Sequence, residues 1–101
     1  MRIVKGKRIV EWAQMYPNAA PTLMHWKKLI EDIQFANFAE LRRYFPSADQ
    51  VIVSSGNPVT VFNIKRQYRL IAAIHYNRGV VYTLRFLTHA EYDKDKWKVE
   101  L

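Results

Sequence analysis

The sequence contains no cysteine among its 101 residues. This absence excludes disulfide bonds, thiolate metal ligands and a cysteine nucleophile. No apolar stretch is long enough to span a bilayer, and the opening segment MRIVKGKRIVEW lacks the apolar run of a signal peptide. No glycine-rich phosphate loop and no metal-ligand spacing are present. We therefore expect a cytoplasmic protein without membrane contact, resident metal or small-molecule cofactor.

Acidic residues are missing from a long central segment. None lies between Asp49 and Glu91, whereas that segment carries Lys65, Arg66, Arg69, Arg78 and Arg85. The formal net charge of the whole chain is +7. A surface with only positive charge repels itself unless an anion lies on it, so the pattern favours a polyanionic or acidic partner. Solubility alone is the alternative explanation, although mixed charges achieve it more readily.

Half of the residues are hydrophobic, which is enough for one folded domain over residues 1–101. Helical spacing of apolar residues predicts helices over residues 8–16 and, after Pro17, from a cap at Asn18 to Ile33. Asn37 and Glu40 have the spacing of a capping box for one further helical turn.

After Asp49 the hydrophobic period changes to two. This period predicts strands at residues 50–53, 59–64, 68–76 and 80–88, in addition to a short strand at residues 2–4, before the helices. Turn signals at residues 56–58 and 77–79 predict antiparallel hairpins. We expect an α+β fold of order β-α-α-β-β-β: a twisted, mostly antiparallel sheet, a helix pair on one face and a short C-terminal helix.

Alternation along the last two predicted strands assigns their faces. The even-numbered residues of 68–76 and 80–88 are bulky and uncharged, so we expect them to pack under the helices. Arg69 and Arg85 would then project together from the opposite, concave face. Adjacent strands would bring the two guanidinium groups near enough to share one phosphate, whose oxygens match their planar fork of donors.

The segment after the last strand carries the acid–base candidate. His89 follows a strand end and stands at helical spacing from Tyr92, and imidazole can exchange a proton near neutral pH. Glu91 either orients His89 or points outward. Tyr92 either stacks on a nucleic-acid base or anchors the last helical turn in the core. We expect the other two histidines, His25 and His75, to be structural.

Several segments resemble a known family. They are VFNI (61–64), YRLI (68–71), THAEYDK (88–94) and, upstream, NFAELRRYFPSAD (37–49). These segments are similar to HigB-type toxins of type II toxin–antitoxin systems, within the RelE-like mRNA interferases. The resemblance implies a RelE-like fold and a metal-independent endoribonuclease that cleaves translated mRNA on the ribosome and so inhibits translation. It also implies a cognate helix-turn-helix antitoxin, HigA-like, that holds the toxin inactive.

The resemblance also implies roles for particular residues. Arg69 and Arg85 would clamp the scissile phosphate, with His89 and Tyr92 completing the catalytic set. Apart from the resemblance, the charge and position of four further cations make them candidates for RNA binding: Lys65, Arg66, Lys94 and Lys96. For Lys94 and Lys96 a purely solvated position is an equal alternative. The chemistry would be attack of a ribose 2′-hydroxyl on the adjacent phosphate, so that RNA is cleaved and DNA is spared.

One position departs from the family pattern. Two glycines often follow VFNI in the family, whereas this chain has Lys65 and Arg66 there. We therefore expect the turn to be built differently, with two extra cations at its rim. Two other functions stay open: a non-catalytic RNA- or ribosome-binding module, and a protein-interaction domain that docks an acidic partner.

Overall fold

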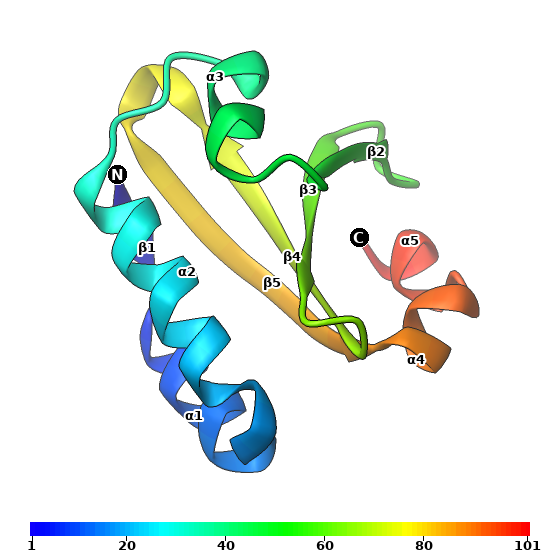
Figure 1. Cartoon of the computed structure of the whole chain (residues 1–101). Coiled ribbons are helices and arrows are strands. Elements are labelled where there is room, and N and C mark those ends of the chain that lie inside the picture. Colours follow the sequence, from blue (N-terminus) through cyan, green and yellow to red (C-terminus); the bar gives the residue numbers. More distant parts are fainter.

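A computed structural model describes the whole chain, residues 1–101 (Figure 1). Its strands are β1 (Arg2–Val4), β2 (Asp49–Ile52), β3 (Pro58–Ile64), β4 (Tyr68–His75) and β5 (Val80–Thr88). Its helices are α1 (Lys7–Met15), α2 (Ala20–Asp32), α3 (Phe38–Tyr44), α4 (His89–Asp93) and α5 (Lys96–Glu100). Single 3₁₀ turns, η1 (Pro17–Ala19) and η2 (Tyr76–Arg78), connect α1 to α2 and β4 to β5. No helix is both long and apolar enough to cross a bilayer.

The five strands form one mixed sheet in the order β1-β5-β4-β3-β2. Only β1 and β5 pair in parallel, and the other neighbours are antiparallel, including the two hairpins predicted from the turn signals. The α+β class is therefore confirmed, but the predicted element order is incomplete. The summary order leaves out the strand predicted at residues 50–53, which is present as β2. The turn predicted after Asn37 is a separate helix, α3, and two C-terminal helices stand in place of one.

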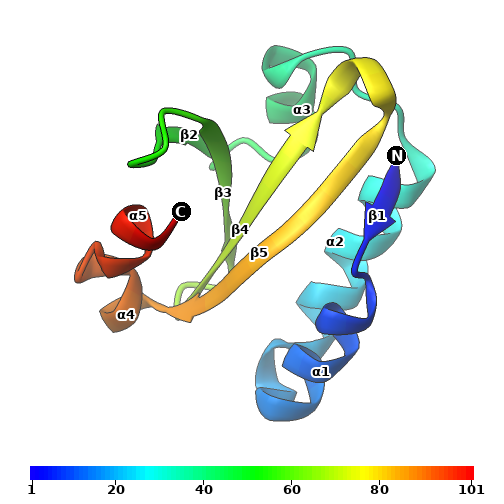
Figure 2. The same ribbon diagram turned by 180° about the vertical axis from the view of Figure 1, so that it is seen from behind.

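Helices α1 and α2 lie against one face of the sheet and enclose the main core (Figures 1 and 2). The apolar face of α2 places Trp26 edge-on to Phe62 of β3, with ring centroids 5.3 Å apart. Trp12 of α1 stacks on Phe86 of β5 at 5.5 Å. Full burial of a large apolar side chain contributes roughly 1.5–3 kcal/mol, so these contacts fix the helix pair on the sheet.

The predicted helix caps have mixed outcomes. Asn37 caps α3 as expected, because its Oδ1 accepts a hydrogen bond from the backbone N–H of Glu40 at 2.9 Å. Asn18 does not cap α2, so that prediction is wrong. It lies within η1, and its Oδ1 accepts a hydrogen bond from the hydroxyl of Tyr68 at 2.9 Å. This contact ties the α1–α2 connection to the first residue of β4.

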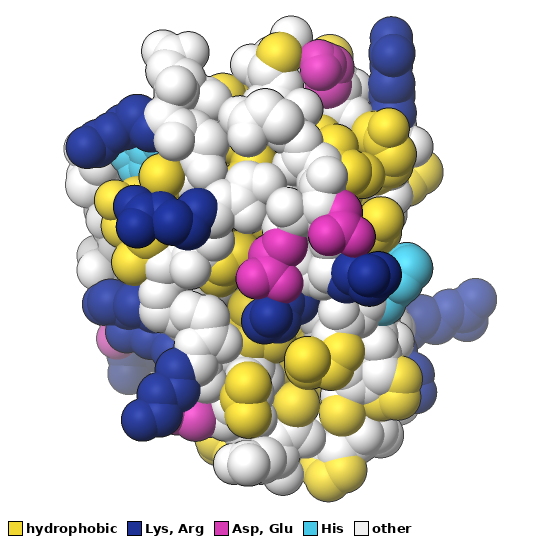
Figure 3. Space-filling view, turned by 90° about the vertical axis from the view of Figure 1, so that its left-hand side faces the viewer, with side chains coloured by type: hydrophobic (Ala, Val, Ile, Leu, Met, Phe, Trp, Pro, Cys, Tyr) yellow, Lys and Arg dark blue, Asp and Glu magenta, His cyan; other side chains and the backbone are white.

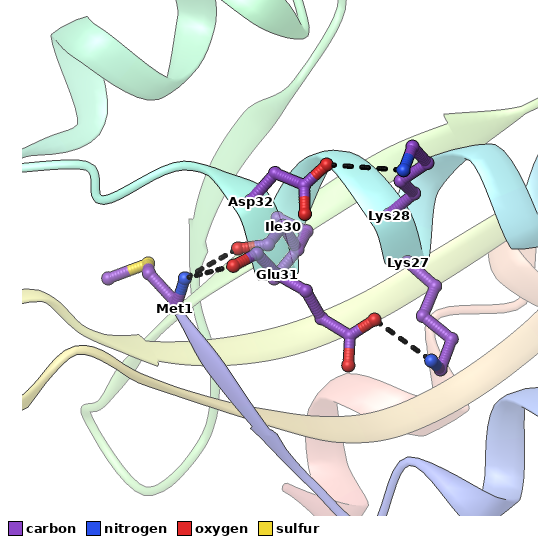
Figure 4. A network of polar contacts seen from close by, with 6 residues as sticks. All are labelled: Met1, Lys27, Lys28, Ile30, Glu31 and Asp32. Atoms are coloured by element: carbon purple, nitrogen blue, oxygen red, sulfur yellow. Dashed lines mark hydrogen bonds and ion pairs between the residues drawn. The ribbon is translucent and has the colours of Figure 1, made fainter.

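The end of α2 is held by polar contacts (Figure 4). The amino group of Met1 donates hydrogen bonds to the carbonyl oxygens of Ile30 at 2.6 Å and Ile33 at 2.9 Å. Such contacts satisfy carbonyl groups that the helix itself leaves unpaired. On the outer side, Lys27 pairs with Glu31 at 2.9 Å and Lys28 pairs with Asp32 at 3.5 Å. Figure 3 shows this side, where acidic side chains lie beside basic ones.

A β-bulge in β5 changes the predicted faces of that strand. Ile71 pairs with Arg85 and Ala72 with Thr83, which leaves Leu84 as the extra residue. In the residues of β5 that precede the bulge, the alternation is the reverse of the predicted one. Val81 and Thr83 are therefore buried on the helix side. The prediction that even-numbered residues pack under the helices is therefore correct for β4 and wrong for β5 before the bulge. Arg85 follows the bulge and keeps its expected face.

The face opposite the helix pair is not fully open. A second small core lies there, in which Trp97 of α5 packs with Ile71 and with three valines: Val53, Val59 and Val61. Trp97 is 2% exposed and Ile71 is fully buried. The C-terminal segment therefore covers the β2–β3 side of this face. The concave face, from which Arg69 and Arg85 were expected to project, is therefore partly covered.

Candidate active site beside the C-terminal helices

Sheet register places Arg69 and Arg85 on one face, as predicted. Arg69 pairs with Leu87 and Ile71 pairs with Arg85. Because Arg69 and Ile71 lie two residues apart on β4, the two arginines occupy diagonal positions on neighbouring strands. Diagonal pairs lie about 7–8 Å apart, within reach of long side chains. The two guanidinium groups can therefore approach one small anion.

Neither arginine has an acidic partner, and both are held by backbone carbonyl groups. Arg69 Nη1 donates to the carbonyl oxygens of Tyr68 at 2.9 Å and Arg66 at 3.1 Å. Arg85 Nη1 donates to the carbonyl oxygen of Leu84 at 2.9 Å. Each half-buried side chain keeps its remaining N–H donors without a carboxylate. Each is thus oriented and still able to bind an anion.

Arg8 is a third arginine near this site, and the sequence did not single it out. From α1 its Nη1 donates to the carbonyl oxygen of Thr83 at 2.9 Å and approaches that of Leu84 at 3.5 Å. Leu84 is the bulge residue whose carbonyl oxygen also accepts from Arg85. Arg8 therefore stabilises the bulge that sets the direction of Arg85. No sequence signal marked it, because a bulge leaves no fixed spacing.

His89 begins α4, directly after β5. Its side chain is 53% exposed, and its Nδ1 lies 2.8 Å from Oδ2 of Asp93, one helical turn later. Its backbone N–H donates to the carbonyl oxygen of Gln67 at 2.7 Å, which fastens α4 to the β3–β4 turn. His89 stands two residues beyond Leu87, the strand partner of Arg69. The histidine is therefore at the same end of the sheet as the arginines.

Of the two alternatives for Glu91, orientation of His89 is not the one observed. Glu91 forms a capping box with Thr88: Glu91 Oε1 accepts from the Thr88 N–H at 3.0 Å, and Thr88 Oγ1 accepts from the Glu91 N–H at 3.2 Å. The carboxylate beside His89 belongs to Asp93, which sequence reasoning missed. The signal was available, because residues four apart on a helix face one another.

Tyr92 has one side of its ring in the second core. The ring stacks on Trp97 with centroids 5.3 Å apart, and the Arg69 guanidinium carbon lies 5.8 Å from the Tyr92 ring centroid. The Tyr92 carbonyl oxygen also accepts from the indole N–H of Trp97 at 3.0 Å. This geometry favours the second alternative, a core tyrosine, which in addition supports Arg69.

The turn after β3 carries Lys65 and Arg66, both exposed. Lys65 has φ of 54°, in the left-handed region that glycine adopts without strain. The turn therefore has a glycine-type conformation at this position, although the residue is lysine. Both residues lie next to Gln67, whose carbonyl oxygen accepts from the backbone N–H of His89.

Lys94 and Lys96 lie on the outer side of the C-terminal helices. They are exposed and line a hollow of about 330 Å³ with Leu87 and Trp97, next to Glu91 and Glu100. Two carboxylates at this hollow make it less favourable for a phosphate backbone than the arginine face. Nowhere does the chain gather three or more His, Asp or Glu side chains in a group that could hold a metal ion.

Comparison with known proteins places this arrangement in a family. Residues 19–95 match the model of the HigB toxins, described as the RelE-like toxic component of a toxin–antitoxin system. The chain is also 30% identical, over 95 residues, to a protein named mRNA interferase HigB from Escherichia coli O6:H1, strain CFT073. That match covers 93% of this chain and 90% of the relative. The chain belongs to the HigB family of RelE-like toxins from toxin–antitoxin systems.

Proposed function

We propose that this protein is an mRNA endoribonuclease that cleaves translated messages on the ribosome without a metal ion. One observation carries the proposal: two guanidinium groups without acidic partners share a sheet face beside an exposed histidine. The Escherichia coli relative bears the name mRNA interferase, which supports the proposal. Inhibition of translation would follow from loss of the message.

The arginines would bind the scissile phosphate. During cleavage the phosphate gains negative charge on its equatorial oxygens, and fixed cations stabilise that charge most when they are already oriented. The carbonyl contacts of Arg69 and Arg85 hold both groups in place before RNA binds. Removal of one such preorganised donor costs about a hundredfold to a thousandfold in rate.

His89 would carry one of the two proton transfers. The 2′-oxygen forms a bond to phosphorus while the bond from phosphorus to the 5′-oxygen breaks. One proton leaves the 2′-hydroxyl, and one reaches the departing 5′-oxygen. The products are then a 2′,3′-cyclic phosphate and a 5′-hydroxyl. Since a carboxylate only accepts, the Asp93 contact favours the tautomer with hydrogen on Nδ1 and leaves Nε2 free for the transfer.

The partner of this toxin would be a HigA-like, helix-turn-helix antitoxin that holds it inactive in the cytoplasm. The net charge of +7 and the acid-free stretch from Asp49 to Glu91 favour an antitoxin that presents carboxylates. The antitoxin would inhibit either by covering the arginine face or by making the toxin too bulky for the ribosomal decoding site. We favour the second route, because the proposed cleavage takes place on the ribosome.

The test is single-turnover cleavage of mRNA on a programmed ribosome, followed by analysis of the fragment ends. His89→Gln should lose about a hundredfold or more in the chemical step and keep most RNA affinity, because glutamine cannot exchange a proton near neutral pH. His25→Gln is the matched control, since His25 is an exposed histidine on α2. A 2′-methoxy group at the cut site should block wild-type cleavage. Fragments with a 5′-phosphate, or a fully active His89→Gln protein, would refute this mechanism; binding without cleavage would support the non-catalytic module.

A further inference from the structure

A pair of aromatic side chains lies on the arginine face, away from the proposed catalytic groups. His75 at the end of β4 meets Tyr82 of β5 edge-to-face, with ring centroids 5.2 Å apart and planes at 82°. Tyr82 pairs with Ala73 across the strands, and His75 pairs with Val80. Ala73 and His75 alternate with Ile74, which packs in the helix-side core. The pair therefore projects from the same face as Arg69 and Arg85.

No element of the chain covers this pair. His75 is exposed and Tyr82 half-buried. Helix α5 packs through Trp97 on β3 and on Ile71 of β4, and α4 contacts β4 and β5 at the opposite end of β5 from the β4–β5 turn (Figures 1 and 2). His75 also lines two hollows, of about 370 Å³ with Pro58 and Ala73 and about 400 Å³ with Asn77 and Arg78. Both hollows are large enough for a small planar ligand.

The register sets the distance from this pair to the arginines. Arg85 pairs with Ile71, and Tyr82 pairs with Ala73, two residues further along β4. At about 3.3 Å per residue, Tyr82 lies about 7 Å from Arg85 along the sheet, and His75 about 13 Å. One or two nucleotides of an extended single strand span these distances. A strand whose phosphate lies at Arg85 can therefore place a neighbouring base on the aromatic pair.

The charge of the surroundings favours nucleic acid over an apolar or basic partner. Arg2 of β1 pairs with Val80, so it stands in the same row of the sheet as His75. Arg78 follows in η2, and both arginines are exposed. None of β1, β3, β4 and β5 carries an acidic residue. Aromatic rings beside unpaired cations are how proteins bind single strands, the rings stacking on bases and the cations contacting the backbone.

We propose that His75 and Tyr82 form a base-binding subsite for the nucleotide one or two positions from the cleaved bond, with Arg2 and Arg78 contacting its backbone. This inference rests on the proposed function, since it extends the same RNA track along β4 and β5. It reverses the expectation that His75 is structural. The subsite positions the RNA and takes no part in bond cleavage.

The test combines variants of the protein with variants of the RNA. The probe is a short single-stranded RNA methylated at every 2′-hydroxyl, so that it is not cleaved, and binding is followed by fluorescence anisotropy. A series of probes lacks one base at each position in turn. Wild type should bind one or two of these abasic probes about tenfold more weakly than the intact RNA, which is a typical contribution of one stacked base.

Tyr82→Leu and His75→Leu should bind intact RNA about tenfold more weakly and should no longer distinguish those abasic probes. Tyr82→Phe keeps the ring and should bind as wild type does. Tyr44→Leu and His25→Leu, exposed residues of α3 and α2, should behave as wild type. Thermal unfolding followed by circular dichroism confirms that each variant is folded.

The outcomes separate this subsite from the nuclease. If wild type shows no abasic position that weakens binding, or if the leucine variants remain sensitive to it, the subsite is overturned while cleavage can still stand. If the variants lose affinity for the antitoxin alone, the pair is a protein-docking site and the proposal is overturned. If the binding pattern is as expected but wild type cleaves no RNA, the subsite stands and the nuclease fails.

Discussion

His89 and Asp93 form the contact that distinguishes this histidine from the other two. Their side chains meet at 2.8 Å between Nδ1 and Oδ2, across one turn of α4, and both are more than half exposed. The capping box of Thr88 and Glu91 fixes the first turn of the same helix. The histidine is thus held by its own helix, and its Nε2 is left without a protein partner. A base oriented through its other nitrogen is a common arrangement in acid–base catalysis.

Asp93→Ala should slow cleavage about tenfold to a hundredfold, a loss of the size seen when the carboxylate that orients a metal-bound histidine is removed. RNA affinity should change little, because Asp93 carries no positive charge and does not touch the arginines. The measurement is single-turnover cleavage, together with nitrogen NMR of the His89 ring. The NMR signal should show hydrogen on Nδ1 in wild type and a mixture of tautomers in the variant.

Asp32→Ala is the matched control for this substitution. Asp32 also pairs across one helical turn, with Lys28, and is 59% exposed against 58% for Asp93. It lies on α2, away from the site. Equal activity of Asp93→Ala and Asp32→Ala would remove Asp93 from the mechanism, whatever the role of His89.

Arg85→Ala should lower the cleavage rate about a hundredfold and leave the fold intact, because the side chain makes one carbonyl contact. Arg69→Ala should lose similar activity and also about 1 kcal/mol of unfolding free energy, since its contacts to two carbonyl groups and the Tyr92 ring disappear. Arg→Lys at either position should restore only part of the rate, because the bidentate fork is lost. Rates come from cleavage assays, and stability from urea unfolding.

Arg42→Ala is the control that separates the loss of stability expected for Arg69→Ala from its loss of activity. Arg42 donates to the carbonyl oxygen of Pro46 at 3.1 Å and lies 6.0 Å from the Phe38 ring centroid, contacts of the same kind as those of Arg69. It should lose similar stability and keep full activity. If Arg69→Ala and Arg85→Ala both cleave at the wild-type rate at equal concentration of folded protein, the two arginines do not clamp the phosphate.

Sequence reasoning located much of this fold because alternation and turn signals are local. Strand β4, the Asn37 cap and the two hairpins follow from neighbours within a few residues. The bulge at Leu84 does not, because it depends on contacts between β5, β4 and α1 through Arg8. The cover that Trp97 gives to Ile71 is likewise a contact between distant segments.

In the candidate site, too, the features set by local sequence were predicted, and those set by contacts between distant segments were not. The shared face of Arg69 and Arg85 followed from strand alternation, though Arg85 keeps that face only because it lies after the bulge. The Asp93 contact was missed although its helical spacing was visible. The His75–Tyr82 pair was out of reach, because the bulge turns Tyr82 away from the helix side to which alternation assigned it.

Tyr76→Phe should raise the free energy of unfolding by about 1 kcal/mol at pH 7, because the Tyr76 hydroxyl is enclosed without a hydrogen-bond partner. Burial raises the pKa of this hydroxyl above the ordinary value of 10.0. The Thr60 side chain offsets part of the rise through its proximity, although the two groups do not reach hydrogen-bond geometry. The unfolded chain therefore ionises first, so wild type should lose stability as the pH rises through 10. Tyr76→Phe should lack this loss.

Urea unfolding at pH 7 and at pH 10.5 measures both effects. Tyr44→Phe is the control, since Tyr44 is 51% exposed, whereas the Tyr76 hydroxyl is enclosed. A Tyr76→Phe protein that is less stable than wild type at pH 7 would mean that the hydroxyl has a partner in solution.

Lys65→Gly tests the left-handed position in the turn between β3 and β4. Relief of the left-handed backbone strain at φ of 54° exceeds the entropy that glycine loses on folding, so stability should rise by about 0.5–1 kcal/mol. RNA binding should weaken at the same time, because one cation leaves the rim. For a single phosphate contact, the slope of log affinity against log salt should fall by about 0.7.

Lys65→Ala is the matched variant: it loses the same charge without relief of strain, so it should show the same change in salt slope and no gain in stability. If both variants keep the wild-type salt slope, Lys65 does not contact RNA and the lysine has another role. If Lys65→Gly is no more stable than Lys65→Ala, the turn does not hold its left-handed conformation in solution.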